Sequence, residues 1–117
     1  MSQRFGRDPE YTRGGGGNSS VKADGIVYIK PSGVSLAVIE AEDLVPLATA
    51  PLLDLLLKGG SEEDEARIPG APDPVMRAAA KVRMAEAKGR RPSVELMFHS
   101  LLPETFVLHT HAIVPNA

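Results

Sequence analysis

The stretch from Pro92 to His111, PSVELMFHSLLPETFVLHTH, most constrains what this chain can fold into, because it contains all three histidines of the sequence. Phe106 to His111 is predicted to be a β-strand, in which successive side chains point to opposite faces. Val107, His109 and His111 then share one face, so that two imidazoles can converge on a single ion. Strand histidines at this spacing can also be structural, so the pair alone does not define a site.

A carboxylate lies just upstream of this strand. Ser93 to Leu102 is predicted to be a short helix, which places Glu95 and His99 one turn apart on one face. A helix-borne carboxylate beside a strand-borne His-x-His pair is typical of a divalent-metal site with its acid/base partner. Ser93 suits the N-cap of this helix, and its hydroxyl with the first amides could equally bind an anion.

Composition excludes several other classes of protein. The chain has 117 residues, enough for one domain, and its net charge of −2 with scattered Lys and Arg gives no sign of a nucleic-acid surface. No apolar run reaches the ~20 residues of a membrane span, and MSQRFGRDPE lacks the apolar core of a secretory signal, so a cytoplasmic protein is expected. Without cysteine, a transition-metal site must use imidazole and carboxylate ligands.

A glycine run near the N-terminus offers a candidate anion site. Residues Gly14 to Ser20, GGGGNSS, can adopt positive φ and turn successive N–H groups inward, with Asn18 adding a side-chain donor. A flexible linker is the alternative. The run leads directly into strand-like residues, and it is neither a Walker loop nor a GxGxxG motif.

The next residues are predicted to form a hairpin. Ala23-Asp24-Gly25 is a turn, so that Asn18–Lys22, with Ser19–Lys22 as its firmest part, pairs with Ile26–Lys30. Pro31-Ser32-Gly33 then breaks the second strand. A closed hairpin brings Ser32 and Gly33 to the same end as the glycine run, where two donor-rich turns would form a phosphate site.

Other elements follow from local signals in the sequence, such as proline in a first helical turn and glycine after a last one. The expected elements are a short strand at Leu36–Ile39, one helical turn at Glu40–Leu44, extended chain at Val45–Leu47, and helices at Pro51–Lys58 and Pro74–Lys88.

Five separated motifs, taken together, resemble the class II aldolase/adducin family, which includes fuculose-phosphate and rhamnulose-phosphate aldolases. The motifs are Gly17-Asn18-x-Ser20, Lys30-Pro31-Ser32-Gly33, Pro92-Ser93-x-Glu95, His99 and His109-x-His111.

The resemblance implies an α/β fold of three layers, with a mainly antiparallel central sheet flanked by helices. It also implies zinc-dependent, reversible retro-aldol cleavage of a sugar phosphate to dihydroxyacetone phosphate and an aldehyde. By resemblance, His109 and His111 bind the Zn²⁺ or other divalent ion, Glu95 is the acid/base, and His99 is scaffold. The phosphate would be held by Gly17, Asn18, Ser32, Gly33 and Ser93.

The match covers residues from about Arg4 to the end, and Ala112 stands where the family often has proline. The family's third metal histidine and a C-terminal tyrosine lie farther downstream than this chain reaches. The expectation is therefore one domain over residues 1–117, incomplete at its C-terminus and its N-terminus, with weak or no turnover. The strand of His109 should be central in the full sheet, so a chain that ends after it would leave one strand edge unpaired and prone to association. A homo-oligomer is therefore expected, as in the tetrameric family members. Two alternatives stay open: a non-catalytic adducin-head-like module, and a sugar-phosphate epimerase or dehydratase on the same scaffold.

Overall fold

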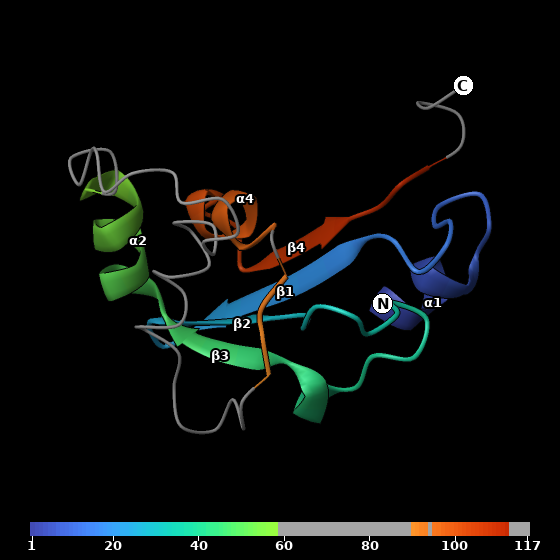
Figure 1. Ribbon diagram of the computed structural model, residues 1–117, viewed down its shortest axis with the longest axis horizontal. Helices are drawn as coiled ribbons and strands as arrows, with labels where there is room; N and C mark the ends of the chain where they lie inside the picture. Colours follow the sequence, from blue (N-terminus) through green and yellow to red (C-terminus); the bar gives the residue numbers. More distant parts are fainter. Residues whose placement is uncertain (59–89, 94, 113–117) are drawn as a thin grey trace, which may run out of the picture.

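The computed structural model describes residues 1–58, 90–93 and 95–112, and these form a mixed helix and strand fold around one antiparallel sheet (Figure 1). The strands lie in the order β3-β2-β1-β4, and all three neighbouring pairs are antiparallel. Their bounds are β1 Asn18–Ala23, β2 Ile26–Ile29, β3 Val45–Ala48 and β4 Phe106–His109. The predicted fold class is confirmed.

The β1–β2 hairpin forms as its turn residues predict. Asp24 and Gly25 have φ values of 51° and 75°, and a turn with positive φ at both central residues matches the right-handed twist of the strands. Ala23 pairs with Ile26 across this turn. The ladder continues beyond β2, because the Lys30 N–H donates to the Ser19 carbonyl at 3.0 Å.

Residues Val45–Ala48 form a full strand, β3, where extended chain was expected. Pro46 lies opposite Tyr28 of β2. Proline cannot donate a hydrogen bond to a ladder, and it is tolerated here because β3 is an outer strand of the described sheet.

The strand predicted at Leu36–Ile39 is wrong, since residues 36–38 form a turn. Its carbonyl groups are satisfied from outside the sheet: Gln3 Nε2 donates to the Ile39 carbonyl at 3.0 Å, and Arg7 Nε donates to that of Ala37 at 3.1 Å. The single helical turn expected next is confirmed as a 3₁₀ turn over Ala41–Asp43.

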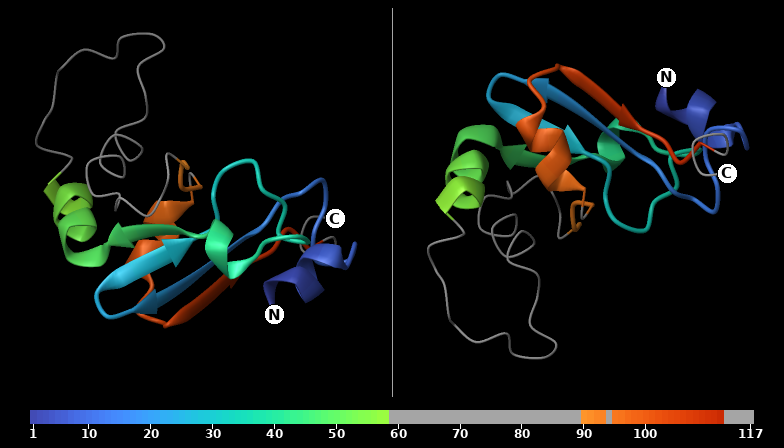
Figure 2. Two further views of the ribbon diagram at one scale, coloured as in Figure 1. Left: turned by 90° about the horizontal axis from the view of Figure 1, so that it is seen from below. Right: turned by 90° about the horizontal axis from the view of Figure 1, so that it is seen from above.

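Three α-helices lie in the described residues. The bounds are α1 Ser2–Arg7, α2 Thr49–Lys58 and α4 Leu96–Leu101. Helix α1 forms against residues 36–39, at the opposite end of the sheet from α2 (Figure 2). The start of α2 lies two residues before the predicted Pro51, and α4 begins three residues after the predicted Ser93. The helix predicted at Pro74–Lys88 lies outside the described residues.

The core lies between one face of the sheet and helices α2 and α4. Its six side chains have no exposed surface, and burial of each stabilises the fold by about 1.5–3 kcal/mol. They are Val27, Ile29, Val45, Leu47, Leu52 and Leu96.

The histidine strand β4 is the other outer strand of the described sheet. Association of copies through this edge stays a prediction. None of the described helices combines the length and apolar character that spanning a lipid bilayer requires.

Gly17 joins the N-terminal loop to the sheet, and we expect Gly17→Ala to destabilise the protein more than Gly15→Ala does. Both glycines have positive φ, +83° at Gly17 and +77° at Gly15. A Cβ at Gly15 meets nothing within 4 Å, whereas one at Gly17 would lie 2.9 Å from the His109 carbonyl oxygen. Gly15→Ala should therefore cost only the conformational penalty of about 1–2 kcal/mol, and Gly17→Ala should add a backbone shift. Urea unfolding measures both free energies, and equal losses would contradict the close approach.

Candidate functional site

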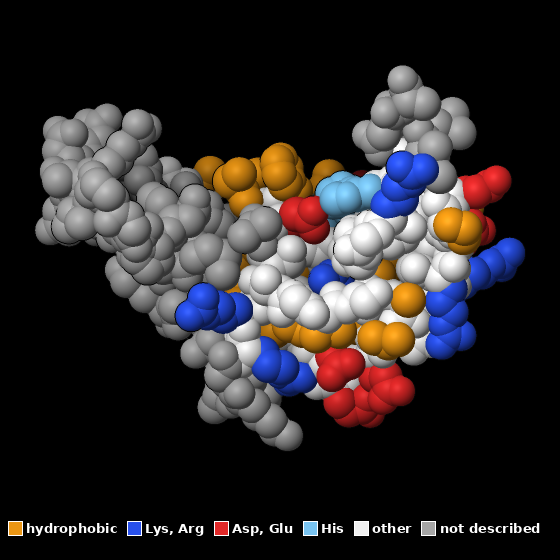
Figure 3. Space-filling model, turned by 45° about the vertical axis from the view of Figure 1, so that its right-hand side comes forward, with side chains coloured by type: hydrophobic (Ala, Val, Ile, Leu, Met, Phe, Trp, Pro, Cys, Tyr) orange, Lys and Arg blue, Asp and Glu red, His pale blue; other side chains and the backbone are white. Residues whose placement is uncertain are grey.

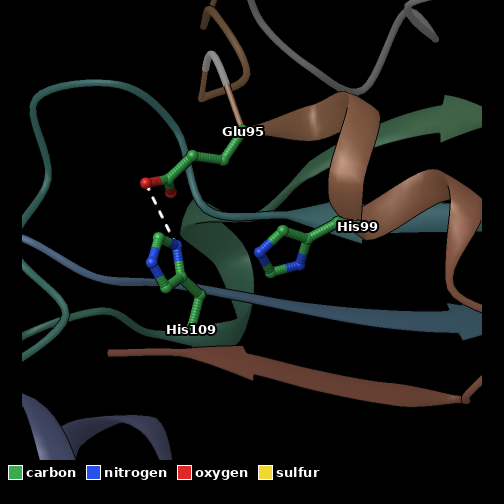
Figure 4. Close-up of side chains that lie close together, drawn as sticks. All are labelled: Glu95, His99 and His109. Atoms are coloured by element: carbon green, nitrogen blue, oxygen red, sulfur yellow. Dashed lines mark ion pairs between the residues drawn. The ribbon is translucent and has the colours of Figure 1, made fainter. Parts of the chain in front are cut away.

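Glu95, His99 and His109 come together above one face of the sheet, from three different positions in the fold (Figure 4). Glu95 is the N-cap of α4, His99 lies one turn into that helix, and His109 is the last residue of β4. One ligand atom from each residue lies within 4.8 Å of the other two. Glu95 Oε1 and His109 Nδ1 are 3.1 Å apart, close to the roughly 3.4 Å that separates two ligands of a tetrahedral zinc.

The register of β1 explains why these side chains meet. Asn18 pairs with His109 and Ser20 pairs with Val107, so all four side chains share the sheet face that α4 covers. Ser20 Oγ then lies 2.7 Å from Nδ1 of His99. Strand β1 thus contacts His99 of α4 through Ser20 and places His109 of β4 next to it.

His99 has an unused ligand atom. Its side chain is 1% exposed, and its Nε2 is buried without a hydrogen-bond partner among the described residues. A Ser20 hydroxyl that accepts from Nδ1–H would leave a bare lone pair on Nε2, which is the form a metal ion binds. The donor set therefore fits a divalent cation.

Burial keeps His99 neutral. The pKa of His99 is lowered to about 4, mainly by desolvation; the Glu95 charge opposes this shift, and His109 and Lys22 contribute to it. A neutral imidazole needs no deprotonation before it binds a metal.

The carboxylate of Glu95 is held in its ionised form. Partial burial raises the pKa of Glu95, but the Asn18 side chain, His109 and His111 together lower it below its ordinary value. An ionised carboxylate at this position can bind a cation or accept a proton.

His111 lies beyond the end of β4, which is two residues shorter than predicted. Its Nε2 is 3.8 Å from Glu95 Oε1, and its ring centroid is 4.8 Å from that of His109. A Cβ at Gly16 would lie 2.6 Å from His111 Nδ1, so the glycine loop packs against this ring. The structure thus brings both predicted histidines to Glu95, while the tighter described cluster includes His99. The i, i+4 spacing of Glu95 and His99 was the sequence signal for this third donor.

Two of the segments expected to hold phosphate, the Ser32-Gly33 turn and Ser93, are neighbours. Pro31 forms a β-bridge with Pro92, flanked by hydrogen bonds from Ser32 N–H to the Arg91 carbonyl at 2.9 Å and from Ser93 N–H to the Lys30 carbonyl at 3.1 Å. This bridge places Ser93 beside the Ser32-Gly33 turn. It also occupies the backbone amides of both serines. The Ser93 hydroxyl donates to Glu95 Oε2, so the Ser32 hydroxyl is the remaining donor of this pair for an anion.

Asn18 adds a further donor beside Glu95, whose pKa its side chain lowers. It has no exposed surface, and its Oδ1 accepts from Ser19 N–H at 2.8 Å. Its Nδ2 is buried with no hydrogen-bond partner among the described residues. Ser93 Oγ lies 3.4 Å from Glu95 Oε2. Figure 3 shows acidic and histidine side chains meeting on this face beside small polar and backbone atoms.

Fold and site together define an α/β domain with a carboxylate–imidazole cluster of the kind that binds a divalent metal, next to turns rich in hydrogen-bond donors. Residues 1–115 match the family model described as Class II Aldolase and Adducin N-terminal domain. The chain belongs to this family.

A solved structure from Thermoplasma acidophilum, described as the N-terminal class II aldolase domain of a conserved protein, is similar at 28% identity and a TM-score of 0.72. The match covers 96% of this chain and 52% of that one, so the chain spans about half the length of that structure. No curated protein matches the sequence.

The stability of the metal-free protein should fall between about pH 7 and about pH 5 in part through His99. Its pKa is about 4 in the folded state and has an ordinary value of 6.5, so the unfolded chain takes up the proton first as the pH falls. His99→Asn can keep the contact with Ser20 but cannot be protonated, so its loss of stability over this range should be smaller. Urea unfolding at the two pH values measures the difference; an identical pH dependence in the variant would refute it.

We expect Zn²⁺ binding, measured by calorimetry, to depend on Glu95 and His109. His109→Ala and Glu95→Gln should each weaken the affinity about ten-fold or more, because each removes a ligand atom. Glu104→Gln is the matched control, since Glu104 is an exposed carboxylate outside the cluster. His99→Asn and His111→Asn then reveal which further imidazole binds. Unchanged affinity in His109→Ala would contradict the site.

Proposed function

We propose that the chain performs the carbon–carbon lyase chemistry of class II aldolases, the reversible retro-aldol cleavage of a sugar phosphate to dihydroxyacetone phosphate and an aldehyde. The observation that carries the proposal is the contact between Glu95 and His109, 3.1 Å apart, with the unused Nε2 of His99 beside them. Family membership over residues 1–115 supports the same chemistry.

His109 would hold the ion, together with His111 as the family resemblance implies or with His99 and Glu95 as the cluster permits. A Zn²⁺ or similar divalent ion would supply Lewis acidity for the substrate oxygen that gains negative charge. Neutral imidazoles and an ionised carboxylate are suitable ligands for such an ion.

Glu95 is the proposed acid/base. When the carbon–carbon bond breaks, its electron pair stays with the dihydroxyacetone phosphate fragment, and that carbon must then gain a proton. Glu95 is partly buried and lies at the metal cluster. In the condensation direction its ionised carboxylate would remove a C3 proton from dihydroxyacetone phosphate. In cleavage the protonated carboxyl group would return that proton to C3, and the hydroxyl proton released as the aldehyde forms would pass to water. Ser93 Oγ, 3.4 Å from Oε2, orients the carboxyl group.

The phosphate would bind at the end of the site formed by Gly17, Asn18, Ser32, Gly33 and Ser93. Asn18 Nδ2 and the Ser32 hydroxyl would supply donors there, and Gly33, with a φ of +84°, allows the turn that brings them together. Neutral donors that converge on one point suit an anion without a cluster of lysines.

The half-reaction that Glu95 alone performs gives the sharpest test. With Zn²⁺, the protein in D₂O should exchange one C3 hydrogen of dihydroxyacetone phosphate for deuterium, observed by ¹H NMR. This step needs no residue that handles the aldehyde. Glu95→Gln should slow the exchange about 10²–10⁴-fold, because it removes the base, whereas Glu104→Gln should exchange at the wild-type rate.

Wild-type protein that binds Zn²⁺ yet exchanges no hydrogen would overturn the proposed lyase chemistry. It would favour the non-catalytic interaction module of the same family.

A further inference from the structure

Lys30 is a buried lysine that the proposed chemistry does not use. Lys30 is 5% exposed and lies directly after β2, between this strand and the Ser32-Gly33 turn. Lysine is rarely buried unless its ammonium group is paired, so the partners of this group define what the residue does.

The ammonium group closes the turn. Lys30 Nζ donates to the Pro31 carbonyl at 3.2 Å and to the Val34 carbonyl at 2.6 Å. These two carbonyls flank Ser32 and Gly33, so the side chain ties together the start and the end of the turn. Hydrogen bonds from an ionised donor are stronger than those between neutral groups.

The backbone of Lys30 also contacts two other segments at the phosphate-binding end. These are Asn18–Ser19, called the β1 arm, and Arg91–Ser93, called the Ser93 arm. The Lys30 N–H donates to the Ser19 carbonyl at 3.0 Å, next to Asn18 on β1, and its carbonyl accepts from Ser93 N–H at 3.1 Å. A single residue therefore contacts the β1 arm, the Ser32-Gly33 turn and the Ser93 arm.

We propose that Lys30 is a positioning residue, whose ammonium group holds the Ser32-Gly33 turn, and with it the Ser93 arm, in the geometry that receives phosphate. The inference rests on the proposed function, because it concerns the phosphate end of that site. An apolar side chain of similar length could fill the same space, but it would leave the Pro31 and Val34 carbonyls without this donor. Burial lowers the pKa of Lys30, and the Glu95 charge opposes that shift.

The matched variants are Lys30→Met, which keeps the length of the side chain and removes the ammonium group, and Ser32→Ala, which removes a hydroxyl donor and leaves the lysine contacts. In the ligand-free protein, Lys30→Met should speed amide hydrogen exchange at Ser32 and Ser93 about ten-fold or more, and Ser32→Ala should leave the Ser93 amide unchanged. Both variants should weaken binding of inorganic phosphate, measured by calorimetry. Zn²⁺ affinity should stay within about two-fold of wild type, because the contacts of Lys30 that the structure describes include no residue of the metal cluster.

The outcomes separate the inference from the proposed function. Wild-type exchange rates in Lys30→Met overturn the positioning role, even if phosphate binding weakens, because the lysine would then act on the anion itself. Equal phosphate affinity in wild type and Lys30→Met also overturns it and leaves the proposed function intact. A wild-type protein that binds no phosphate overturns both the inference and the phosphate part of the proposed function.

Chemical rescue distinguishes positioning from a general loss of packing. The sequence has no cysteine, so Lys30→Cys introduces a unique thiol that can be alkylated in denaturant before refolding. Alkylation with 2-bromoethylamine restores an amine at nearly the original length, and 1-bromopropane gives a neutral side chain of the same size. Slow exchange at Ser32 and restored phosphate binding with the amine alone support the proposal. Equal recovery with both side chains overturns it.

Discussion

The pairing of β1 with β4 is the interaction on which the site depends. These strands are separated by more than eighty positions in the sequence, yet their register sets Asn18 opposite His109 and Ser20 opposite Val107. A shift by one residue would turn every one of these side chains to the other face of the sheet. The same register brings Ser20 beneath His99, so one strand pairing aligns the helix histidine, the strand histidine and the buried amide.

The face that carries this site is half apolar and half polar. Val27, Ile29 and the other residues of the hydrophobic core pack toward α2. Asn18, Ser20 and His99 are buried polar residues toward the metal cluster. Each buried polar atom without a partner costs about 1–3 kcal/mol, and both Asn18 Nδ2 and His99 Nε2 are in this state within the described part of the chain. Such a cost can be retained where the free atom serves a ligand, and both atoms belong to residues that lie beside Glu95.

Local signals in the sequence predicted the parts of the structure that depend on local chemistry. The Asp24-Gly25 turn predicted the hairpin, and spacing alone brought Glu95 and His99 to one face. Strand β3 was not predicted because it contains Pro46. Proline is accepted in an outer strand, and no local sequence pattern shows which strand will be an outer one. The apolar run Leu36–Ile39 has the composition of a strand, but side chains of α1 donate hydrogen bonds to its carbonyl groups and it forms a turn instead. The bridge between Pro31 and Pro92 joins residues far apart in the sequence, so the occupied amides of Ser32 and Ser93 could not be predicted.

The two possible sets of imidazole ligands differ in how they are held. His99 lies on a helix and is fixed by Ser20 at 2.7 Å, whereas His111 follows the end of β4, where its ring rests against the glycine loop. A ligand that is already oriented by a neighbouring hydroxyl loses little freedom when it binds an ion, and His99 meets that condition. His111 is 46% exposed at its side chain, and its Nε2 lies 3.8 Å from Glu95 Oε1, so it can also reach an ion held by Glu95. His109 belongs to both sets, because β1 fixes its position opposite Asn18. The invariant part of the centre is therefore the Glu95–His109 contact, and the third ligand depends on whether preorganisation in the helix or access from the loop is favoured.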